Sequence, residues 1–433
     1  MKLSVIGCGY LGAVQAAAMA ELGHEVIGID VDPDKIEQLQ AGRPPFFEPG
    51  LPEVLTSACE SGRLRFSTDI ADVAGATVHF IAVGTPQSRD GNAADLRYVD
   101  AAIDALLPHL EDGDLVVGKS TVPVGTARRL ADRIAASGSG ARVAWNPEFL
   151  REGYAVKDTI EPDRLVYGVE DSRDVEVLDA VYASAIASGT PRIVTNFPTA
   201  ELVKVAANAF LATKISFINA MAEIAEATDA DVTRLADAIG HDARIGRRFL
   251  NAGVGFGGGC LPKDIRAFTA RAEELGRGES VAFLKEVDAI NLRRRQRVVD
   301  LAHQALDGVM YGRKIAVLGV TFKPHSDDVR DSPALDVAVQ LKGLGADVVV
   351  TDPQGIDNAR KRHPQLLYSE VTEEAVRHAD LVVLVTEWPE YVALDPVHVK
   401  DIARGSTIID GRNTLDADAW KAAGWRYVGM GRN

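Results

Sequence analysis

The sequence predicts an α/β protein built from two doubly wound domains with a helical domain between them. Three patterns lead to this prediction: a unit of strand, turn, helix and strand at the start, a long Ala-rich stretch in the middle, and a second alternation of strands and helices afterwards. The chain has 433 residues, too many for one ordinary core, so two or three domains are expected.

The first domain is predicted from its opening unit. Residues 1–33 read as a buried strand, a glycine turn, an Ala-rich helix and a second apolar strand that ends in Asp30. Strand-like runs then alternate with helical stretches as far as residues 142–145. This alternation predicts a parallel sheet with helices on both faces. We expect this domain to span residues 1–196.

The middle of the chain is predicted to be one long helix. Residues 199–231 contain no Gly or Pro, and apolar side chains occur on nearly every face. A helix of roughly 30 residues would be about 45 Å long. A helix that is apolar all round needs cover on all sides. We therefore expect it to be the spine of a central helical domain, residues 197–300, and to contribute to a homodimer interface.

The last part of the chain repeats the opening theme. The segments RKIAVLGVTFKP and LDVAVQLKGLGADVVVTDP read as strand, loop, helix, corner and a strand that ends in Asp352. The pattern lacks the GxGxxG turn and continues through LVVLVTEWPEY and STIIDGRN. We expect a second doubly wound domain over residues 301–433.

Composition and charge restrict the class of protein. Hydrophobic residues make up 46% of the chain and charged residues 25%, which is typical of a globular protein. The formal net charge of -15 argues against nucleic-acid binding, because nucleic-acid surfaces concentrate positive charge. A nucleotide is still an acceptable ligand, since helix N-termini and one or two basic side chains hold small phosphates locally.

The cysteines and the start of the chain indicate a compartment. Cys8, Cys59 and Cys260 are too few and too scattered for a disulfide framework or a zinc site, which indicates a reducing environment. A strand begins almost at the first residue, and there is no leader and no apolar run of about 18 residues. We therefore expect a cytoplasmic protein that binds no membrane and no metal.

A glycine turn follows the first strand and opens the first helix. Its glycines would let a pyrophosphate approach the helix N-terminus, and Asp30 would accept hydrogen bonds from a ribose. Since a carboxylate repels a 2′-phosphate, NAD is predicted rather than NADP. Lys35 is either a contact on the adenosine side or a solvated surface residue. The expected cofactor contacts of this unit are Gly7, Gly9, Tyr10, Leu11, Gly12 and Asp30.

Polar residues follow other strands of the first domain. Thr85 and Thr121 lie just after apolar runs, at the carboxyl ends of strands where doubly wound folds bind ligands. Each alone marks only a loop, but in a nucleotide-binding sheet both become candidate contacts to the nicotinamide half or to a catalytic water. Glu148 and Glu152 are four residues apart, where a helical turn would place them on one side. Taken in isolation they are more simply surface acids.

Lys204 and Asn208 are also four residues apart, on the predicted long helix. They are polar groups on an otherwise apolar cylinder, and buried polar groups need partners. We favour a catalytic role for this pair over a structural hydrogen bond.

The stretch GFGGGCLPKD, residues 255–264, is the most specific in the chain. A free Cys is usually an inert core residue. Here a glycine run lets the backbone approach a ligand, and Lys263 and Asp264 follow Cys260 directly, a setting for a thiolate beside a proton acceptor. In a dehydrogenase, such a Cys would capture the aldehyde formed by a first hydride transfer.

Seven segments together resemble the UDP-glucose 6-dehydrogenase family, within the UDP-glucose/GDP-mannose dehydrogenases. They are GCGYLG, KSTVPVG, NPEFLREG, ELVKVAANAFLATKISFINAMAEI, RIGRRFLNAGVGFGGGCLPKD, FKPHSDDVRDSP and DGRN. The similarity spans nearly the whole chain, and ARIGRRFLNAG resembles the UDP-glucose branch. The resemblance implies a Rossmann domain, a central dimerising domain and a C-terminal UDP-binding Rossmann-like domain. It implies the four-electron oxidation of UDP-glucose to UDP-glucuronate with NAD.

The resemblance also implies residue roles. Cys260 would be the nucleophile, Lys204 and Asn208 would steady the oxyanion, and Asp264 would support the catalytic water. Glu148 and Thr121 would assist thioester hydrolysis, while Glu152, Lys263 and Arg330 would contact NAD. The implied substrate contacts are Glu148, Phe149, Leu150, Arg151, Glu152, Lys204, Asn208, Phe249, Leu250, Asn251, Ala252, Gly253, Gly257 and Lys323, with Arg244 reaching across the dimer.

One position departs from the family pattern, and other functions stay open. Gly259 stands where the family usually has Ser, which would loosen the Cys loop. A β-hydroxyacid dehydrogenase shares the glycine turn and the Lys-xxx-Asn pair, but Cys260 and the second nucleotide-type domain argue against it. A catalytically dead sensor would have lost one of the catalytic residues. UDP-N-acetylhexosamines, UDP-galactose or GDP-mannose remain alternative substrates.

Overall fold

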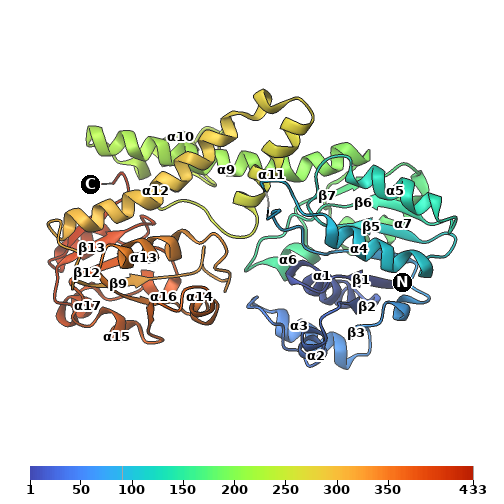
Figure 1. Cartoon of the computed structure of the whole chain (residues 1–433), viewed down its shortest axis with the longest axis horizontal. Helices are drawn as coiled ribbons and strands as arrows, with labels where there is room; N and C mark the ends of the chain where they lie inside the picture. The colour runs from blue at the N-terminus through green and yellow to red at the C-terminus, as the bar shows by residue number, and fades with distance from the viewer. Residues whose placement is uncertain (90, 433) are drawn as a thin grey trace. The chain divides into compact units, whose positions relative to one another are not determined.

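The computed structural model describes residues 1–89 and 91–432, which form two compact units, each built around one sheet (Figure 1). The first unit comprises Met1–Ala207 and Ala270–Gly276. The second comprises Asn208–Thr269 and the chain from Arg277 onward. The predicted three-domain boundaries, after residues 196 and 300, remain a prediction.

The first unit contains an eight-stranded sheet. Its strands are β1 (Lys2–Ile6), β2 (Glu25–Ile29), β3 (Leu64–Ser67), β4 (Val78–Ile81), β5 (Leu115–Gly118), β6 (Arg142–Trp145), β7 (Leu165–Gly168) and β8 (Arg192–Thr195). They lie in the order β3-β2-β1-β4-β5-β6-β7-β8, and neighbours are parallel except β6 and β7, which meet antiparallel at Trp145 and Gly168. The strand order reverses between β1 and β4, the kind of position where doubly wound sheets bind ligands.

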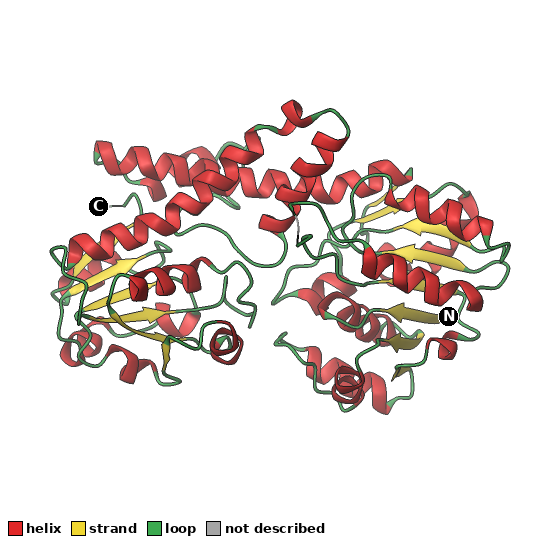
Figure 2. Cartoon of the chain, viewed as in Figure 1, coloured by secondary structure: helices red, strands yellow, loops and turns green. Residues whose placement is uncertain are grey.

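Helices cover both faces of this sheet (Figure 2). One hydrophobic cluster joins Leu3 and Val5 to helices that follow β1 and β2, and another joins Ile27 and Ile29 to helices that follow β4 and β5. Successive strand residues point to opposite faces, so both faces are buried as predicted. The helices are α1 (Tyr10–Glu21), α2 (Pro33–Gln40), α3 (Leu51–Glu60), η1 (Ile70–Val73), α4 (Arg97–Leu106), η2 (Leu107–His109), α5 (Thr126–Ala136), α6 (Ala155–Ile160), α7 (Ser172–Val181) and α8 (Ala183–Ala187).

The predicted long helix is α9, which runs from Phe197 to Thr228 over 32 residues. It ends before Asp229, whose φ of 53° is incompatible with a continued helix. The helix is not covered on all sides within one chain, because Phe210, Phe217 and Ile224 are exposed. Its other residues pack with α10 (Val232–Gly240), α11 (Leu261–Glu274), η3 (Gly278–Val281) and α12 (Phe283–Ala305).

The sequence analysis expected no apolar run of about 18 residues, and one helix nevertheless has the length and mean composition that a membrane span needs. Among the described residues, α9 passes that test, with a mean hydropathy of 1.3 in its most apolar window, and 44% of that window is buried in the protein. The Ala-rich run raises the mean without forming a block of large side chains. Core helices of globular proteins pass the same test.

The second unit contains a six-stranded, all-parallel sheet in the order β11-β10-β9-β12-β13-β14. Its strands are β9 (Lys314–Leu318), β10 (Asp347–Thr351), β11 (Leu367–Tyr368), β12 (Leu381–Leu384), β13 (Thr407–Asp410) and β14 (Arg426–Gly429). Two hydrophobic clusters occupy its two faces, which confirms the predicted second doubly wound fold. Its helices are α13 (Pro333–Gly343), α14 (Ile356–Arg362), α15 (Thr372–Val376), α16 (Pro389–Val392), α17 (Pro396–Ile402) and α18 (Ala417–Ala422).

Candidate active site

The glycine turn after β1 is closely packed. Gly7 has a φ of +91°, and a Cβ atom on it would lie 2.5 Å from the Val83 side chain. A Cβ atom on Gly12 would lie 1.8 Å from the Gly7 carbonyl oxygen. Helix α1 begins directly after Gly9, so Tyr10 and Leu11 supply free N-terminal amides at the carboxyl end of β1. This turn fits the pyrophosphate of a dinucleotide.

Asp30 lies at the end of β2 beside this turn. Its Oδ2 atom accepts a hydrogen bond from Cys8 N at 2.8 Å, and the ammonium of Lys35 lies 2.9 Å from both carboxylate oxygens. Lys35 therefore contacts the acid that is expected to hold the ribose. This position favours a contact on the adenosine side over a solvated surface residue, and the role itself remains a prediction.

The loops after β4 and β5 are bonded to each other. Thr85 Oγ1 donates to the Thr121 carbonyl oxygen at 2.8 Å, and Ser120 Oγ donates to the Val83 carbonyl oxygen at 2.7 Å. Because β1, β4 and β5 are neighbours in the sheet, both threonines lie at the same edge as the glycine turn. The structure thus brings together the predicted cofactor residues of the first unit.

The segment after β6 differs from the prediction. Glu148 and Glu152 do not share a helical turn, because residues 146–153 are irregular and α6 begins only at Ala155. Glu148 is half-buried and its Oε2 atom accepts from Leu150 N at 2.8 Å. Glu152 is buried, and its charge acts on the Tyr10 hydroxyl. The two carboxylates therefore have different surroundings and can serve different roles.

Lys204 forms an ion pair with Glu148. The Lys204 ammonium lies 3.1 Å from Glu148 Oε1 and over the ring of Phe149, and the side chain is only 7% exposed. A buried ammonium is costly unless it is paired, so this contact explains how α9 tolerates the charge. The same ammonium could stabilise negative charge on a bound oxygen.

Asn208 lies one helical turn after Lys204 on α9, within the second unit, and bonds Asp264. Asn208 Nδ2 donates to Asp264 Oδ2 at 2.6 Å, and the Lys263 ammonium lies 2.8 Å from Asp264 Oδ1. Asp264 is buried; Asn208 satisfies Oδ2 by a hydrogen bond, and Oδ1 is compensated by the ion pair with Lys263. The sequence places Lys263 and Asp264 directly after Cys260, and the structure brings Asn208 to Asp264 from more than 50 residues away.

Cys260 directly precedes helix α11 and is the exposed cysteine of the three. Its carbonyl oxygen accepts from Asp264 N at 2.9 Å, which places Asp264 in the first turn of the helix. A negative charge at a helix N-terminus is favoured by the helix dipole. Burial raises the pKa of the Cys8 thiol, and burial also raises the pKa of the Cys59 thiol. Both of these cysteines are therefore poor nucleophiles.

Gly259 packs against Arg330. A Cβ atom on Gly259 would lie 2.4 Å from Cζ of the Arg330 guanidinium, and Gly258 N donates to the Arg330 carbonyl oxygen at 2.9 Å. The space of the missing side chain is therefore filled by a cation. The expectation that Gly259, in place of the family's usual Ser, loosens the Cys260 loop remains a prediction.

The predicted substrate loop, residues 249–253, is part buried and part exposed. Phe249 has a left-handed backbone with a φ of 65°, and Gly253 N donates to Asn219 Oδ1 at 2.9 Å. A Cβ atom on Gly257 would lie 2.2 Å from the Asp331 carbonyl oxygen. The buried members of the predicted set are Leu250, Ala252, Gly253 and Gly257, and the exposed ones are Phe249 and Asn251.

The predicted binding arginines are each held by a neighbouring carboxylate, and Lys323 lies over the Phe322 ring. An exposed pair of this kind stabilises the fold little, so the arginines can exchange partners when an anion binds. The pairs, with their shortest distances, are Arg151 with Asp158 at 2.6 Å, Arg244 with Asp242 at 2.6 Å, and Arg330 with Asp328 at 2.7 Å.

Arg412 is a residue of this region to which the sequence analysis gave no role. Its guanidinium donates to the carbonyl oxygens of Gly255, Phe322 and Val385 at 2.8–3.0 Å. It therefore fastens the glycine run to two loops of the second sheet. The sequence feature that could have indicated a role for Arg412 is the DGRN motif, which directly follows an apolar strand.

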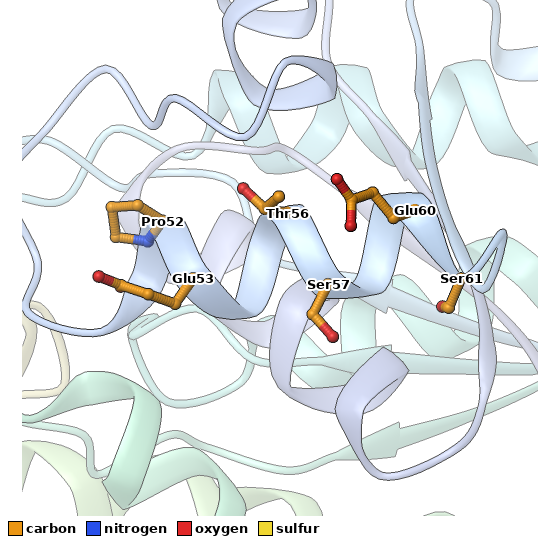
Figure 3. Close-up of a pocket in the computed structure, with 6 residues that line it drawn as sticks. All are labelled: Pro52, Glu53, Thr56, Ser57, Glu60 and Ser61. Carbon is orange, nitrogen blue, oxygen red and sulfur yellow. The ribbon is translucent and has the colours of Figure 1, made fainter.

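A hollow lies elsewhere, on the surface of α3 (Figure 3). It is lined by Pro52, Glu53, Thr56, Ser57, Glu60 and Ser61. All six side chains come from this one helix and its end, and none is a predicted site residue. The hollow is therefore separate from the predicted chemistry.

Comparison with known proteins decides the family. Domain profiles of the UDP-glucose/GDP-mannose dehydrogenases match the chain in three consecutive stretches: the NAD binding domain at residues 1–186, the central domain at 198–293 and the UDP binding domain at 316–417. The chain belongs to the UDP-glucose/GDP-mannose dehydrogenase family. The resemblance inferred from the motifs is confirmed, and so is NAD as the cofactor.

Individual members of the family are similar along their whole length. The chain is 42% identical to the UDP-glucose 6-dehydrogenase of Rhizobium meliloti, with 100% of both chains covered. It is 41% identical to the UDP-glucose 6-dehydrogenase TuaD of Bacillus subtilis, with 100% of this chain and 93% of the relative covered.

Solved structures show the same similarity. A UDP-glucose dehydrogenase from Pyrobaculum islandicum matches with a TM-score of 0.91 and 41% identity, covering 100% of this chain and 98% of that chain. A UDP-D-ManNAc dehydrogenase from Pyrococcus horikoshii matches with a TM-score of 0.87 and 27% identity, covering 100% and 99%. The fold is thus shared by members whose names carry different sugars.

Proposed function

We propose that this protein is a UDP-glucose 6-dehydrogenase, which oxidises the 6-hydroxymethyl group of UDP-glucose to a carboxylate through a thioester on Cys260. The observation that carries the proposal is an exposed Cys260 at the start of α11, with Asp264 in the next turn held by Asn208. The full-length similarity to proteins named UDP-glucose 6-dehydrogenase supports the choice of substrate.

The first unit would supply most of the cofactor contacts. The glycine turn would receive the pyrophosphate, Asp30 and Lys35 the adenosine ribose, and Thr85 and Thr121 the nicotinamide half. NAD, when bound, accepts one hydride in each of two oxidations. Glu152, Lys263 and Arg330 complete the proposed set of cofactor contacts.

Cys260 would link the two oxidations. The first removes a hydride and a proton from the C6 alcohol and gives an aldehyde. The Cys260 thiolate adds to that aldehyde, and the resulting thiohemiacetal loses a second hydride to become a thioester. Water then cleaves the thioester, which releases the carboxylate and regenerates the thiol.

Charged residues around C6 would control protons and the oxyanion. The Lys204 ammonium would stabilise negative charge on the C6 oxygen, together with the Asn208 amide. Asp264 would hold the water that exchanges protons. Glu148, 3.1 Å from the Lys204 ammonium, would accept a proton from the water that attacks the thioester, assisted by Thr121.

A substrate panel tests the proposal. UDP-glucose, UDP-galactose, UDP-N-acetylhexosamines and GDP-mannose are compared by kcat/KM for NADH formation. UDP-glucose should be preferred and should give two NADH per sugar with no free aldehyde. Formation of one NADH per substrate would favour a β-hydroxyacid dehydrogenase instead. A higher kcat/KM for an N-acetylated sugar would identify the protein as a dehydrogenase of UDP-N-acetylhexosamines.

Variants of Cys260 test the covalent step. Cys260→Ser leaves a weaker nucleophile whose ester hydrolyses slowly, so mass spectrometry should find an adduct at position 260. Cys260→Ala should form neither adduct nor acid, while NAD and UDP-glucose still bind. Cys59→Ser is the matched control and should behave as wild type. Acid formation by Cys260→Ala at the wild-type rate would overturn the mechanism.

A homodimer is part of the proposal. Phe210, Phe217 and Ile224 are exposed at intervals of seven residues, which aligns them along one side of α9. This stripe would meet its copy in a second chain, and the exposed Arg244 would reach the partner's site. Phe217→Asp should convert dimers to monomers in light scattering, and an unchanged mass would refute this interface.

The cytoplasm is the proposed location. A mechanism that depends on a free thiol at Cys260 needs a reducing compartment. A fluorescent fusion should be found throughout the cytoplasm, and a signal confined to another compartment would contradict this location.

A further inference from the structure

A buried carboxylate outside the predicted site connects two of its parts. Glu48 is 2% exposed and lies in the loop PPFFEPG between α2 and α3. Its Oε2 atom accepts hydrogen bonds from Gly153 N at 2.6 Å and from the Tyr10 hydroxyl, and its Oε1 atom accepts from Ala155 N at 2.7 Å. The donors come from chain segments more than 100 residues apart in the sequence.

Both segments carry proposed cofactor contacts. Tyr10 is the first residue of α1 and directly follows Gly9 of the glycine turn. Gly153 directly follows Glu152, and Ala155 is the first residue of α6. A single carboxylate thus sets the distance between the turn that would receive the pyrophosphate and the segment that carries Glu152.

The Tyr10 hydroxyl is held as a neutral donor in this cluster. Burial raises its pKa well above the usual value, and the hydrogen bond to Glu48 and the charges of Glu48 and Glu152 raise it further. The Tyr10 ring also packs on Phe46, with the ring centroids 4.8 Å apart. Since burying a carboxylate is costly without donors, Glu48 requires all three contacts in place.

We propose that Glu48 is a positioning residue for NAD: by holding Tyr10 together with residues 153–155, it keeps the glycine turn and Glu152 in the geometry that binds the cofactor. The proposal rests on the proposed NAD-dependent function. It adds a residue that does not touch NAD and acts through Tyr10 and Glu152.

Cofactor affinity of the full-length protein tests the proposal. Glu48→Gln keeps the shape but replaces one acceptor oxygen by a donor that faces other donors. Calorimetric titration should show the Kd for NAD raised at least about tenfold, and raised by a larger factor than the Kd for UDP-glucose. The matched control is Glu53→Gln, the same change on the exposed face of α3 (Figure 3), which should leave both constants unchanged.

A second variant removes only the bridging hydroxyl. Tyr10→Phe keeps the ring on Phe46 and should also weaken NAD binding. The double variant with Glu48→Gln should bind no more weakly than the weaker single variant, because both act through one cluster. Hydrogen exchange without cofactor should show faster exchange at residues 151–156 in Glu48→Gln than in wild type.

The outcomes separate this inference from the function beneath it. A loss of NAD affinity that is larger than any loss of UDP-glucose affinity supports it. If Glu48→Gln lowers only the melting temperature, or does not fold while Tyr10→Phe binds NAD normally, the positioning role is wrong. A wild-type protein that does not bind NAD overturns both the proposed function and the inference.

Discussion

The two sheets share a strand order around their centres but differ at the turn that follows the central strand. In the first sheet α1 begins at Tyr10, directly after the glycine turn of β1. In the second, β9 ends at Leu318 and the next helix, α13, begins only at Pro333. The first turn therefore presents helix amides close to the strand end, and the second places a long loop there instead.

The two sheets also differ in the surroundings of the aspartate that follows the second strand of each, Asp30 after β2 and Asp352 after β10. Asp30 accepts hydrogen bonds from Cys8 N, from Asp32 N and from the Lys35 ammonium, and a ribose could share this carboxylate. Asp352 accepts from Val320 N, from Thr321 and from the Trp388 indole, and its other oxygen accepts from two backbone groups that follow it. At the same position of the same topology, the aspartate of the second sheet is bonded to the fold through both oxygens, whereas Asp30 of the first sheet is proposed to hold a ribose.

The largest expected effect is on Asp352. Asp352→Ala leaves several buried donors without an acceptor, at about 1–3 kcal/mol each, so the free energy of unfolding should fall by at least about 3 kcal/mol. Urea unfolding measures it. The exposed Asp357→Ala on α14 is the control and should change stability by less than about 0.5 kcal/mol. A stable Asp352→Ala that has lost nucleotide binding would mean that this acid serves a ligand after all.

Replacing Lys204 should lower the rate of the chemical step and leave the binding of NAD and UDP-glucose nearly unchanged. Removing an oxyanion partner costs about 3–4 kcal/mol in the barrier, so Lys204→Ala should lower kcat at least about a hundredfold. The Kd values for NAD and UDP-glucose should change little. Stopped-flow NADH formation measures the rate, with Lys361→Ala on the surface of the second unit as control. A folded variant with near-normal kcat would remove Lys204 from the mechanism.

Asp30 should determine cofactor choice. Wild type should prefer NAD over NADP by at least about tenfold in kcat/KM, or about 1.4 kcal/mol, and Asp30→Ala should narrow that ratio. Stability should fall less than in Asp352→Ala, because fewer buried donors lose their acceptor. Asp34→Ala, on the exposed start of α2, should leave the ratio unchanged. Equal use of both cofactors by wild type would contradict the assignment.

The smallest expected effect is a pH dependence confined to the first unit. In the first sheet Ser4 pairs with His79, and His79 Nε2 lies 3.4 Å from Asp114; the corresponding pair in the second sheet is Ala316 and Val382. Burial lowers the pKa of His79, although Asp114 opposes the shift. The folded state therefore binds this proton less readily than the unfolded state, so stability is present above the ordinary pKa and is lost as pH falls below it.

Hydrogen exchange at two pH values checks this dependence. Between pH 7 and pH 5, amides of β1 and β4 should lose protection, while those of β9 and β12 should not. His79→Gln should reduce the difference, and the exposed His241→Gln should not. Equal losses in both sheets would show that His79 is not responsible. Burial also lowers the pKa of His24, so part of the effect should survive in His79→Gln.

The sequence alone predicted the parts of the site whose signal is local. The glycine turn, Asp30 and the glycine run before Cys260 can each be recognised from a short stretch of sequence. The turn is recognisable because its geometry needs Gly, and the glycine run is recognisable because a helix begins where it ends. Both doubly wound folds followed from the alternation of strand-like and helical patterns, and the long helix followed from an Ala-rich stretch without Gly or Pro. The antiparallel contact of β6 and β7 did not, since a buried apolar run reads the same in either direction.

Only the tertiary structure decided which distant groups share a partner. Three contacts join residues that are tens of positions apart in the chain: Glu48 with Tyr10, Glu148 with Lys204, and Asn208 with Asp264. The local sequence around either residue of a pair does not identify its partner. The same holds for Asp352, whose carboxylate is fully hydrogen-bonded, although in the sequence it ends a strand just as Asp30 does. A buried polar side chain takes whichever donors the packed chain brings within about 3 Å, and that set is determined by the whole fold.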